Sequence, residues 1–313
     1  MKYIKWLLLI VALISILYIG KEFFARNMMV KIDDNLSIEY IRPKNGMTLT
    51  FGSGGINQIT SIESFENYEN IFLQVLKRPN RRFITTTDWI GPIIFSTLDN
   101  VGKQRQEAFT GGWHGLKEGE DQVPTATETG RRIFVDEQLI TKKGNFVGQK
   151  VTLEVTNQIN AYNSQNRFSL EETVTYTIHP NKEIQVRVSL KALEAIRVSR
   201  YYGMQVILPP GYEHISYIRK GNVIGEFNQL EETYNAAYTP VDSIVISDKI
   251  EGNNIYASIN LESDINNFLY KKDEEPYAFT TNDRKSYFNI INGIPLYLNQ
   301  GEVFEWEGMY RFD

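Results

Sequence analysis

The stretch of sequence that decides the fold is Val174-Thr-Tyr-Thr-Ile-His-Pro-Asn-Lys-Glu-Ile-Gln-Val-Arg-Val-Ser-Leu190. Apolar and polar residues alternate on both sides of its centre, which is the period of a β-strand with one buried face. Proline and asparagine are typical turn residues. The stretch therefore predicts a β-hairpin with its turn at Pro180-Asn181.

The same alternation recurs on either side of this hairpin. It is found in residues 151–156, at Ile255, Ala257, Ile259 and Leu261, and at Phe304, Trp306, Tyr310 and Phe312, where Gly308 takes one inward position. Clusters of glycine and proline separate the runs, and the apolar residues of 61–76 are too irregular to predict a helix. We predict an all-β fold, an antiparallel β-sandwich resembling a supersandwich, from about residue 28 to the end. A small N-terminal subdomain ending near Lys103 is an open alternative, and residues 117–122 are expected to form a loop.

The N-terminus carries an apolar run from Ile4 to Gly20, interrupted only by Lys5 and Ser15. Its length is at the short end of what spans a bilayer, and no good signal-peptidase site follows it. We therefore predict a transmembrane helix, an uncleaved membrane anchor within residues 1–26, and an extracytoplasmic domain over 27–313. The lysines ahead of the run predict a single-pass cell-membrane protein with a cytoplasmic N-terminus.

Composition excludes several classes of protein. The chain has no cysteine, so it forms no disulfide, and its formal net charge of −5 argues against a nucleic-acid partner. The three histidines, His114, His179 and His214, lie far apart in sequence, and no zinc motif with close ligand spacing occurs. The glycines of residues 51–55 lack the Lys-Ser/Thr pair of a phosphate-binding loop. We predict no metal and no cofactor.

The candidate site centres on Phe109-Thr-Gly-Gly-Trp-His-Gly115. Glycines allow close approach of the backbone to a ligand, the pKa of histidine lies near neutrality, and Trp113 offers a flat apolar face on which a sugar ring can pack. The alternative stays open that this is a glycine-rich turn with a structurally bonded His114 and a Trp113 in the core.

Several segments together resemble a family of uncharacterised phage- and prophage-encoded proteins. They are Thr87-Asp-Trp-Ile-Gly-Pro92, the 109–115 segment followed by Pro124-Thr-Ala126, Asn157-Gln-Ile-Asn-Ala-Tyr-Asn163, Leu193-Glu194, and Tyr201-Tyr-Gly-Met-Gln205. This resemblance covers roughly residues 85–206 and implies no function.

Two broader resemblances imply carbohydrate chemistry. The order of long strands and the closing Leu298-Asn-Gln-Gly-Glu-Val-Phe-Glu-Trp306 resemble galactose-mutarotase-like supersandwiches, a fold that several polysaccharide lyases share. An isolated histidine followed by Tyr-x-x-x-Gln is similar to the arrangement in β-sandwich alginate-type lyases. The chain departs from the first in lacking a placeable second catalytic His and base Glu, and from the second in lacking the arginine-rich strand motif.

The enzyme hypothesis that follows is a polysaccharide lyase working by β-elimination. Such a site needs a base, an acid for the leaving oxygen, and donors on the substrate carboxylate. Its candidate catalytic residues are His114, Tyr201 and Tyr202, with Gln205 and either Asn160 or Arg200 stabilising the enolate-like intermediate. The alternative for the two tyrosines is that they occupy opposite faces of one strand, one inside and one outside.

The second hypothesis is a non-catalytic surface module that binds a polysaccharide or other glycan of the envelope or the extracellular space, or a protein partner, through the Trp113 and Tyr201 region. Its candidate ligand-binding residues are Asp88, Trp89, Trp113, Asn160, Tyr162, Arg200 and Gln205. Glycoside hydrolysis requires two carboxylates across a cleft. No pair stands out among the acids considered, which are Asp88, Glu194, Glu171, Glu172, Glu302 and Glu305.

Overall fold

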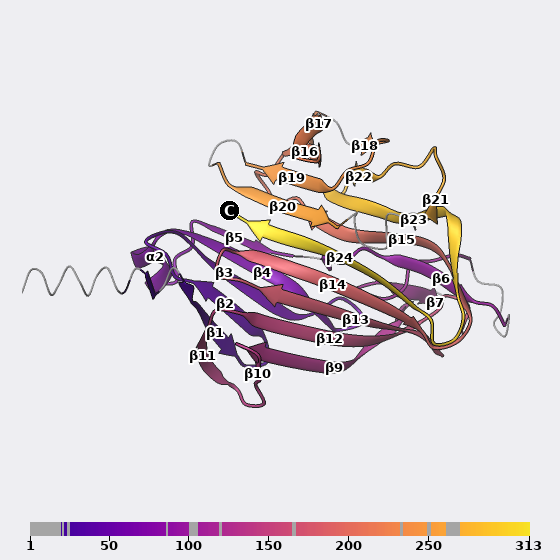
Figure 1. Cartoon of the computed structure of the whole chain (residues 1–313), viewed down its shortest axis with the longest axis horizontal. Helices are drawn as coiled ribbons and strands as arrows, with labels where there is room; N and C mark the ends of the chain where they lie inside the picture. Colours follow the sequence, from indigo (N-terminus) through magenta and orange to yellow (C-terminus); the bar gives the residue numbers. More distant parts are fainter. Residues whose placement is uncertain are drawn as a thin grey trace, which may run out of the picture.

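The computed structural model describes residues 20, 22–23, 26–85, 87–99, 106–118, 121–164, 167–231, 234–248, 252–260 and 270–313. Within them the chain is almost entirely β-strand, paired antiparallel except for one short contact (Figure 1). The predicted all-β class is therefore confirmed.

A ten-stranded sheet, called here the large sheet, forms one layer. Its order is β10-β9-β12-β13-β14-β24-β20-β19-β16-β17. The strands are β9 (Ala126–Val135), β10 (Gln138–Leu139), β12 (Val151–Asn160), β13 (Phe168–Ile178), β14 (Glu183–Ala192), β16 (His214–Arg219), β17 (Asn222–Asn228), β19 (Ser243–Ser247), β20 (Asn254–Ile259) and β24 (Val303–Phe312).

Two smaller sheets face the large one. The N-terminal sheet has the order β11-β1-β2-β3-β4-β5, with β1 (Met28–Ile32), β2 (Leu36–Tyr40), β3 (Lys44–Gly54), β4 (Ile59–Asn70), β5 (Arg81–Ile84) and β11 (Gly144–Gly148). The β15–β23 sheet has the order β18-β22-β23-β15-β6, with β6 (Ile93–Thr97), β15 (Ile196–Ile207), β18 (Asn235–Ala237), β22 (Ala278–Thr281) and β23 (Lys285–Leu298), and β21 (Tyr270–Lys271) beside β23.

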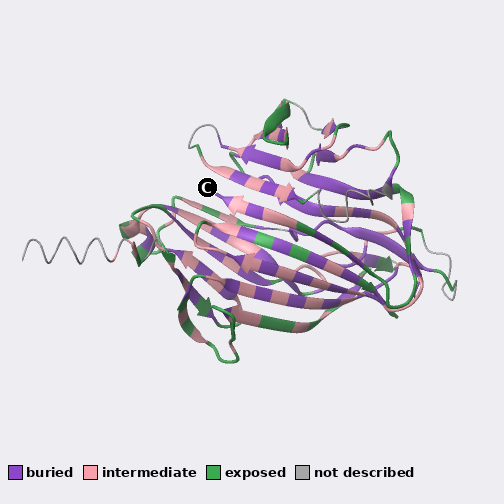
Figure 2. Ribbon diagram, viewed as in Figure 1, coloured by how far each residue is buried: buried purple, intermediate pink, exposed green. Residues whose placement is uncertain are grey.

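Aromatic contacts show how the layers pack. Phe51 of β3 lies 5.1 Å, between ring centroids, from Tyr176 of β13, so the N-terminal sheet covers that half of the large sheet. In the other half of the large sheet, the ring of Tyr201 of β15 lies 6.3 Å from that of Trp306 of β24, so the β15–β23 sheet covers this half. Buried residues alternate with more exposed ones along β12 to β14, as expected for strands with one face in the core (Figure 2). The large sheet thus forms one layer of the sandwich, and the N-terminal and β15–β23 sheets together form the other.

The predicted hairpin is confirmed, because β13 and β14 pair from Leu170↔Ala192 to Ile178↔Ile184 around Pro180-Asn181. The last strand also follows its predicted pattern. Phe304, Trp306, Tyr310 and Phe312 are buried, and Gly308 leaves room for Met204, whose Sδ would lie 2.7 Å from an added Cβ. The N-terminal sheet shares its apolar core with the rest of the molecule.

One local expectation changes, and a second is confirmed, since the irregular residues 61–76 form no long helix. Residues 117–122, expected as a loop, contribute to a two-stranded hairpin of β7 (Gly115–Glu118) and β8 (Asp121–Pro124). Residues 61–76 contain the end of β4 and then a short helix, α2 (Ile71–Val75). Asn70 caps that helix, since its side chain accepts a hydrogen bond from the Leu73 N–H at 3.1 Å.

The predicted membrane anchor falls almost wholly outside the described residues. In the part of the chain that is described, no helix has the length and apolar character that crossing a bilayer requires. The anchor therefore stays a prediction from the sequence.

Candidate functional site

The candidate site lies where the two smaller sheets meet. The chain leaves the N-terminal sheet at β5, crosses in residues 85–92, and enters the β15–β23 sheet at β6. This crossover carries Asp88 and Trp89. It is joined to β15 by a backbone hydrogen bond of 2.7 Å from Gly91 N to Gly203 O and by a bridge between Ile90 and Met204.

Trp89 is a core residue rather than a ligand contact. Its ring is fully buried, edge-on to Tyr310 with a centroid distance of 5.3 Å and close to Phe312. Packing between the sheets leaves the Trp89 ring no exposed face, which argues against the predicted ligand contact.

Asp88 binds the glycine-rich loop. Its Oδ2 accepts a hydrogen bond from the Trp113 N–H at 3.0 Å, and its Oδ1 accepts one from the Thr87 hydroxyl at 3.2 Å. Gly112 has a φ of +49°, and a Cβ there would lie 1.7 Å from Asp88 Oδ2. Only glycine fits at this position, so the Gly-Gly pair serves the contact between the loop and the carboxylate.

The buried side chain of Asn57, in the turn between β3 and β4, organises the same loop. Its Nδ2 donates to the carbonyls of Gly112 and His114, both at 2.8 Å. Its Oδ1 accepts from the N–H groups of Thr125 and Ala126 at 2.7 and 3.1 Å. Sequence reasoning missed Asn57, since nothing in its local pattern marks an asparagine as a bridge to residues more than fifty positions away.

His114, whose carbonyl accepts from Asn57, is partly buried. The centroid of its ring lies 5.6 Å from that of Phe109. Burial lowers the pKa of His114, the Asp88 carboxylate opposes that shift, and the Lys285 cation adds to it. Burial also raises the pKa of Asp88, against the effects of His114 and the Trp113 N–H. The lowered pKa of His114 favours a neutral imidazole at pH 7, and a neutral imidazole retains a lone pair that can accept a hydrogen bond or a proton.

Trp113 points away from His114 toward the N-terminal sheet. Its indole packs on the turn after β3, where a Cβ on Gly54 would lie 2.1 Å from the ring. Trp113 thus supports the loop from one side, while His114 faces the β15–β23 sheet on the other. Trp113 is partly buried, and its role as a stacking face for a sugar stays a prediction.

The two tyrosines of β15 occupy opposite faces of the strand. Tyr201 is 1% exposed, and its hydroxyl accepts a hydrogen bond of 3.0 Å from Trp306 Nε1. Tyr201 is thus packed between the sheets, which argues against the predicted catalytic role. Tyr202 is only partly buried, on the other face.

Tyr202 belongs to a continuous aromatic strip, defined here as Phe109, Tyr202, Phe279, Tyr287 and Tyr234. Ring centroids are 5.8 Å apart for Phe109 and Tyr202, and 5.1 Å from Tyr202 to each of Phe279 and Tyr287. Tyr234 extends the strip, 6.3 Å from Phe279, and is 55% exposed. Since Phe109 also contacts His114, the strip runs from the loop across the β15–β23 sheet. Sequence reasoning missed Tyr234, Phe279 and Tyr287, which lie far along the chain from the loop.

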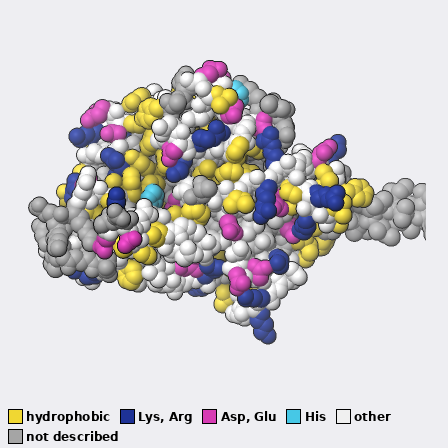
Figure 3. All heavy atoms as spheres, turned by 180° about the vertical axis from the view of Figure 1, so that it is seen from behind, with side chains coloured by type: hydrophobic (Ala, Val, Ile, Leu, Met, Phe, Trp, Pro, Cys, Tyr) yellow, Lys and Arg dark blue, Asp and Glu magenta, His cyan; other side chains and the backbone are white. Residues whose placement is uncertain are grey.

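Charged groups lie beside the strip. The Arg200 cation lowers the pKa of Tyr202, against the larger opposite effect of burial, and Glu275 raises it. Figure 3, which views the molecule from behind, shows hydrophobic side chains interspersed with Lys, Arg, Asp and Glu on that face. Tyr234 is exposed and Phe109 and Tyr202 are partly buried, whereas Phe279 and Tyr287 are buried, at 8% and 7% exposure. The accessible aromatic surface of the strip therefore comes from Tyr234 and from parts of Phe109 and Tyr202, with charged groups near them.

The remaining predicted site residues have structural contacts. Gln205 is buried and donates from Nε2 to the backbone oxygen of Asp88 at 2.6 Å. Asn160 is buried, and its N–H donates to the Thr125 carbonyl at 2.7 Å. Tyr162, partly buried, donates its N–H to Phe95. Asp88, Trp113, His114, Gln205 and Tyr202 are thus linked through direct or shared contacts, but Gln205 and Asn160 are not presented to a ligand.

The acids considered as a possible pair lie in different environments. Glu194 pairs with Arg167 at 2.7 Å and Glu305 with Arg187 at 2.7 Å, both near the surface. Glu172 instead lies in the core, where it lines with Asp88 a cavity of about 20 Å³. That volume suits a single water molecule and not a sugar ring. Of the described residues, no three His, Cys, Asp or Glu side chains cluster in a way that could hold a metal ion.

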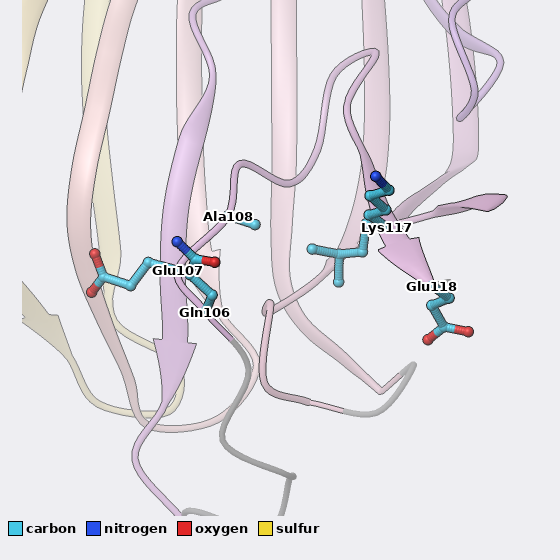
Figure 4. Close-up of a pocket in the computed structure, with 6 residues that line it drawn as sticks. Gln106, Glu107, Ala108, Lys117 and Glu118 are labelled. Atoms are coloured by element: carbon cyan, nitrogen blue, oxygen red, sulfur yellow. The ribbon is translucent and has the colours of Figure 1, made fainter. Parts of the chain in front are cut away.

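A larger opening lies beside the loop. It has a volume of about 510 Å³ between residues 106–108 and the strand β7, which contributes Leu116, Lys117 and Glu118 (Figure 4). Its lining has no aromatic ring. Because ring stacking is the interaction that distinguishes sugar sites from other polar clefts, the aromatic strip is the stronger candidate.

Comparisons with known proteins concern the fold. No protein-family model matches the sequence, and the search of curated proteins gives no match. The chain is similar to the GH36 α-galactosidase AgaB from Geobacillus stearothermophilus, with 13% identity, a TM-score of 0.51, and coverage of 91% of this chain and 41% of that one. The galactosidase domain of the α-galactosidase-sucrose kinase AgaSK gives 9% identity, a TM-score of 0.50 and coverage of 91% and 41%.

A galactose mutarotase-like protein from Lactobacillus casei matches over its full length and 88% of this chain, with 11% identity and a TM-score of 0.39. The chain spans about two fifths of the length of the two galactosidase structures. At these identities the galactosidase likenesses establish a shared β-fold and no activity. The resemblance to phage- and prophage-encoded proteins is addressed by none of the comparisons and stays a prediction.

Proposed function

We propose that this chain is a membrane-anchored, extracytoplasmic β-sandwich that binds polysaccharide through the aromatic strip, without catalysis. The observation that carries the proposal is the run of ring contacts from His114 and Phe109 to the exposed Tyr234. Sugar rings have apolar faces that pack on aromatic rings and hydroxyls that bond to polar neighbours. The strip and the charged groups beside it supply both.

Binding is favoured over catalysis because the predicted catalytic set is dispersed. Tyr201 and Gln205 have buried partners, Trp306 and the backbone of Asp88 respectively. An enzyme needs its base, acid and stabilising donors around a common point. A binding surface needs only an accessible aromatic face.

One observation supports the enzyme alternative at the same surface. His114 and Tyr202 both pack against Phe109, on the outer side of the β15–β23 sheet. A neutral His114 as base and Tyr202 as acid would then carry out β-elimination on an acidic polysaccharide. β-Elimination would release unsaturated chain ends and simple binding would not, so their appearance distinguishes the two functions.

We expect Tyr234→Ala to weaken the binding of an envelope or extracellular polysaccharide about tenfold, since one stacked ring contributes on the order of 1.4 kcal/mol. The matched control is Tyr297→Ala, because Tyr297 is similarly exposed, at 57%, and lies outside the strip. Affinity electrophoresis across a panel of neutral and acidic polysaccharides gives the readout, with melting temperatures measured in parallel.

Equal affinity of the two variants and the native chain for every bound polysaccharide would contradict binding at the strip. If the native chain releases unsaturated ends and His114→Ala does not, the lyase alternative replaces the non-catalytic proposal. A large fall in melting temperature for His114→Ala would instead assign that histidine a structural role.

A further inference from the structure

The short helix α2 turns an apolar face outward. Phe72, Val75 and Leu76, the last in the turn that ends the helix, are 77%, 71% and 62% exposed. Their spacing of three and four residues places them on one side. The opposite side is held by Gln74, which is buried and donates from Nε2 to the carbonyl of Tyr40 at 3.2 Å. The helix is therefore fixed with its apolar residues facing out.

This apolar face lies at the end of the molecule where the chain enters the fold. In the register of β1 and β2, Met29 lies opposite Glu39. Glu39 in turn forms an ion pair with Lys77, which follows α2. The start of β1 and the end of α2 are thus neighbours, and Figure 1 shows α2 at the left end of the sandwich.

The apolar N-terminal sequence ends close to this point along the chain. Seven residues, 21–27, lie between Gly20, the end of the run, and Met28, the first residue of β1, which makes eight Cα–Cα steps. Even a fully extended chain covers about 3.4 Å per residue, so the start of β1 can lie no more than about 27 Å from Gly20. If the run spans a membrane, this end of the domain is held next to the bilayer surface.

The charge of the same region suits a lipid surface. Lys77 and Arg78 directly follow the apolar residues of α2, and Arg26 precedes β1. Lys77 forms an ion pair with Glu39 and Arg26 with Glu22, so Arg78 is the cation here for which no ion pair is described. Exposed aromatic and aliphatic side chains flanked by cations are the pattern of segments that lie in the interface of anionic membranes. Isolated exposed apolar residues are common on proteins, but three on one helical face beside a predicted anchor are not.

We propose that the α2 face, defined as Phe72, Val75 and Leu76, docks into the interface of the membrane that holds residues 1–26. The inference rests on the membrane anchoring in the proposed function. Docking fixes the orientation of the domain, because the large sheet and the aromatic strip then keep a constant tilt relative to the bilayer instead of swinging on the connecting residues.

The absence of cysteine permits a direct test with single labels on the full chain. Phe72→Cys and, as control, Val303→Cys are labelled with an environment-sensitive fluorophore and reconstituted in vesicles of phosphatidylcholine and phosphatidylglycerol. Val303 is 49% exposed and begins β24, at the end of the sandwich away from α2 (Figure 1). We expect the label at 72 to shift to the blue and to be quenched by spin-labelled lipids, and the label at 303 to do neither.

Each other outcome overturns a stated part of the proposal. A chain that does not float with the vesicles contradicts the anchor, and docking with it. A chain that floats while the label at 72 behaves like that at 303 contradicts docking alone. A blue shift at 72 without quenching by the lipid probes means that the face is covered by protein, which also contradicts docking on the membrane.

Discussion

At the scale of single residues, Glu172 links the buried part of the site to the stability of the fold. Burial raises the pKa of Glu172 to about 7 from its usual 4.5, the hydrogen bond from Asn157 opposes the shift, and the Asp88 carboxylate adds to it. The folded protein therefore keeps a proton that the unfolded chain loses between pH 4.5 and 7. The contribution of Glu172 to the free energy of unfolding is thus fully present below pH 4.5 and is lost as the pH rises through 7.

We expect the variant Glu172→Gln not to show this loss of free energy of unfolding as the pH rises through 7. The upper limit of the effect is about 3 kcal/mol, because one pKa unit corresponds to about 1.4 kcal/mol. Urea unfolding of the native chain and the variant at pH 5 and pH 8 measures it. Because the Asp88 carboxylate also raises the pKa of Glu172, the difference between the two proteins includes the loss of this interaction. Equal pH dependence of the two would show that Glu172 does not titrate in this window.

At the scale of elements, the loop between β6 and β7 depends on the turn between β3 and β4. Asn57 satisfies backbone groups of Gly112, His114, Thr125 and Ala126 through one buried side chain. Removing it leaves several of these groups unpaired, and each buried unpaired group costs about 1–3 kcal/mol. We expect Asn57→Ala to lower the free energy of unfolding by about 3 kcal/mol and to broaden the NMR signals of the His114 ring.

The matched control for that variant is Asn228→Ala. Asn228 also uses its side-chain amide, which donates to Glu231 at 3.2 Å, but it does so at the surface. The expected loss there is below about 0.5 kcal/mol. Similar losses in the two variants would mean that the loop does not depend on Asn57.

At the scale of the whole molecule, the three sheets share one apolar core. Phe65 of β4 lies 5.0 Å from Phe312 of β24, and Trp89 of the crossover packs on Tyr310 of the same strand. We therefore expect residues 27–313, without 1–26, to unfold in one cooperative transition. Far-UV circular dichroism, which should show mainly strand, and tryptophan fluorescence should give coincident urea curves.

Two separated transitions would contradict the shared core. They would instead support the alternative of an independent N-terminal subdomain. In that case the Phe51–Tyr176 contact, which joins β3 to β13, should be lost in the first of the two transitions.

The sequence by itself determined the class of the fold and much of its strand pattern. Alternation of apolar and polar residues is a local property that survives any arrangement of the sheets, so the hairpin at Pro180-Asn181 and the inward residues of β24 could be predicted. The motif at residues 109–115 likewise identified the loop on which the site is built.

Only the tertiary structure decided which members of each motif are buried in the core and which are partly exposed. Tyr201 and Tyr202 are neighbours in sequence, yet packing between the sheets buries Tyr201 and leaves Tyr202 partly exposed, and the neighbouring Asp88 and Trp89 are both buried. Asn57, Phe279 and Tyr287 join the loop and the strip through strand pairing and turns across long separations. Such contacts depend on sheet order and register, which composition and periodicity along one chain do not encode.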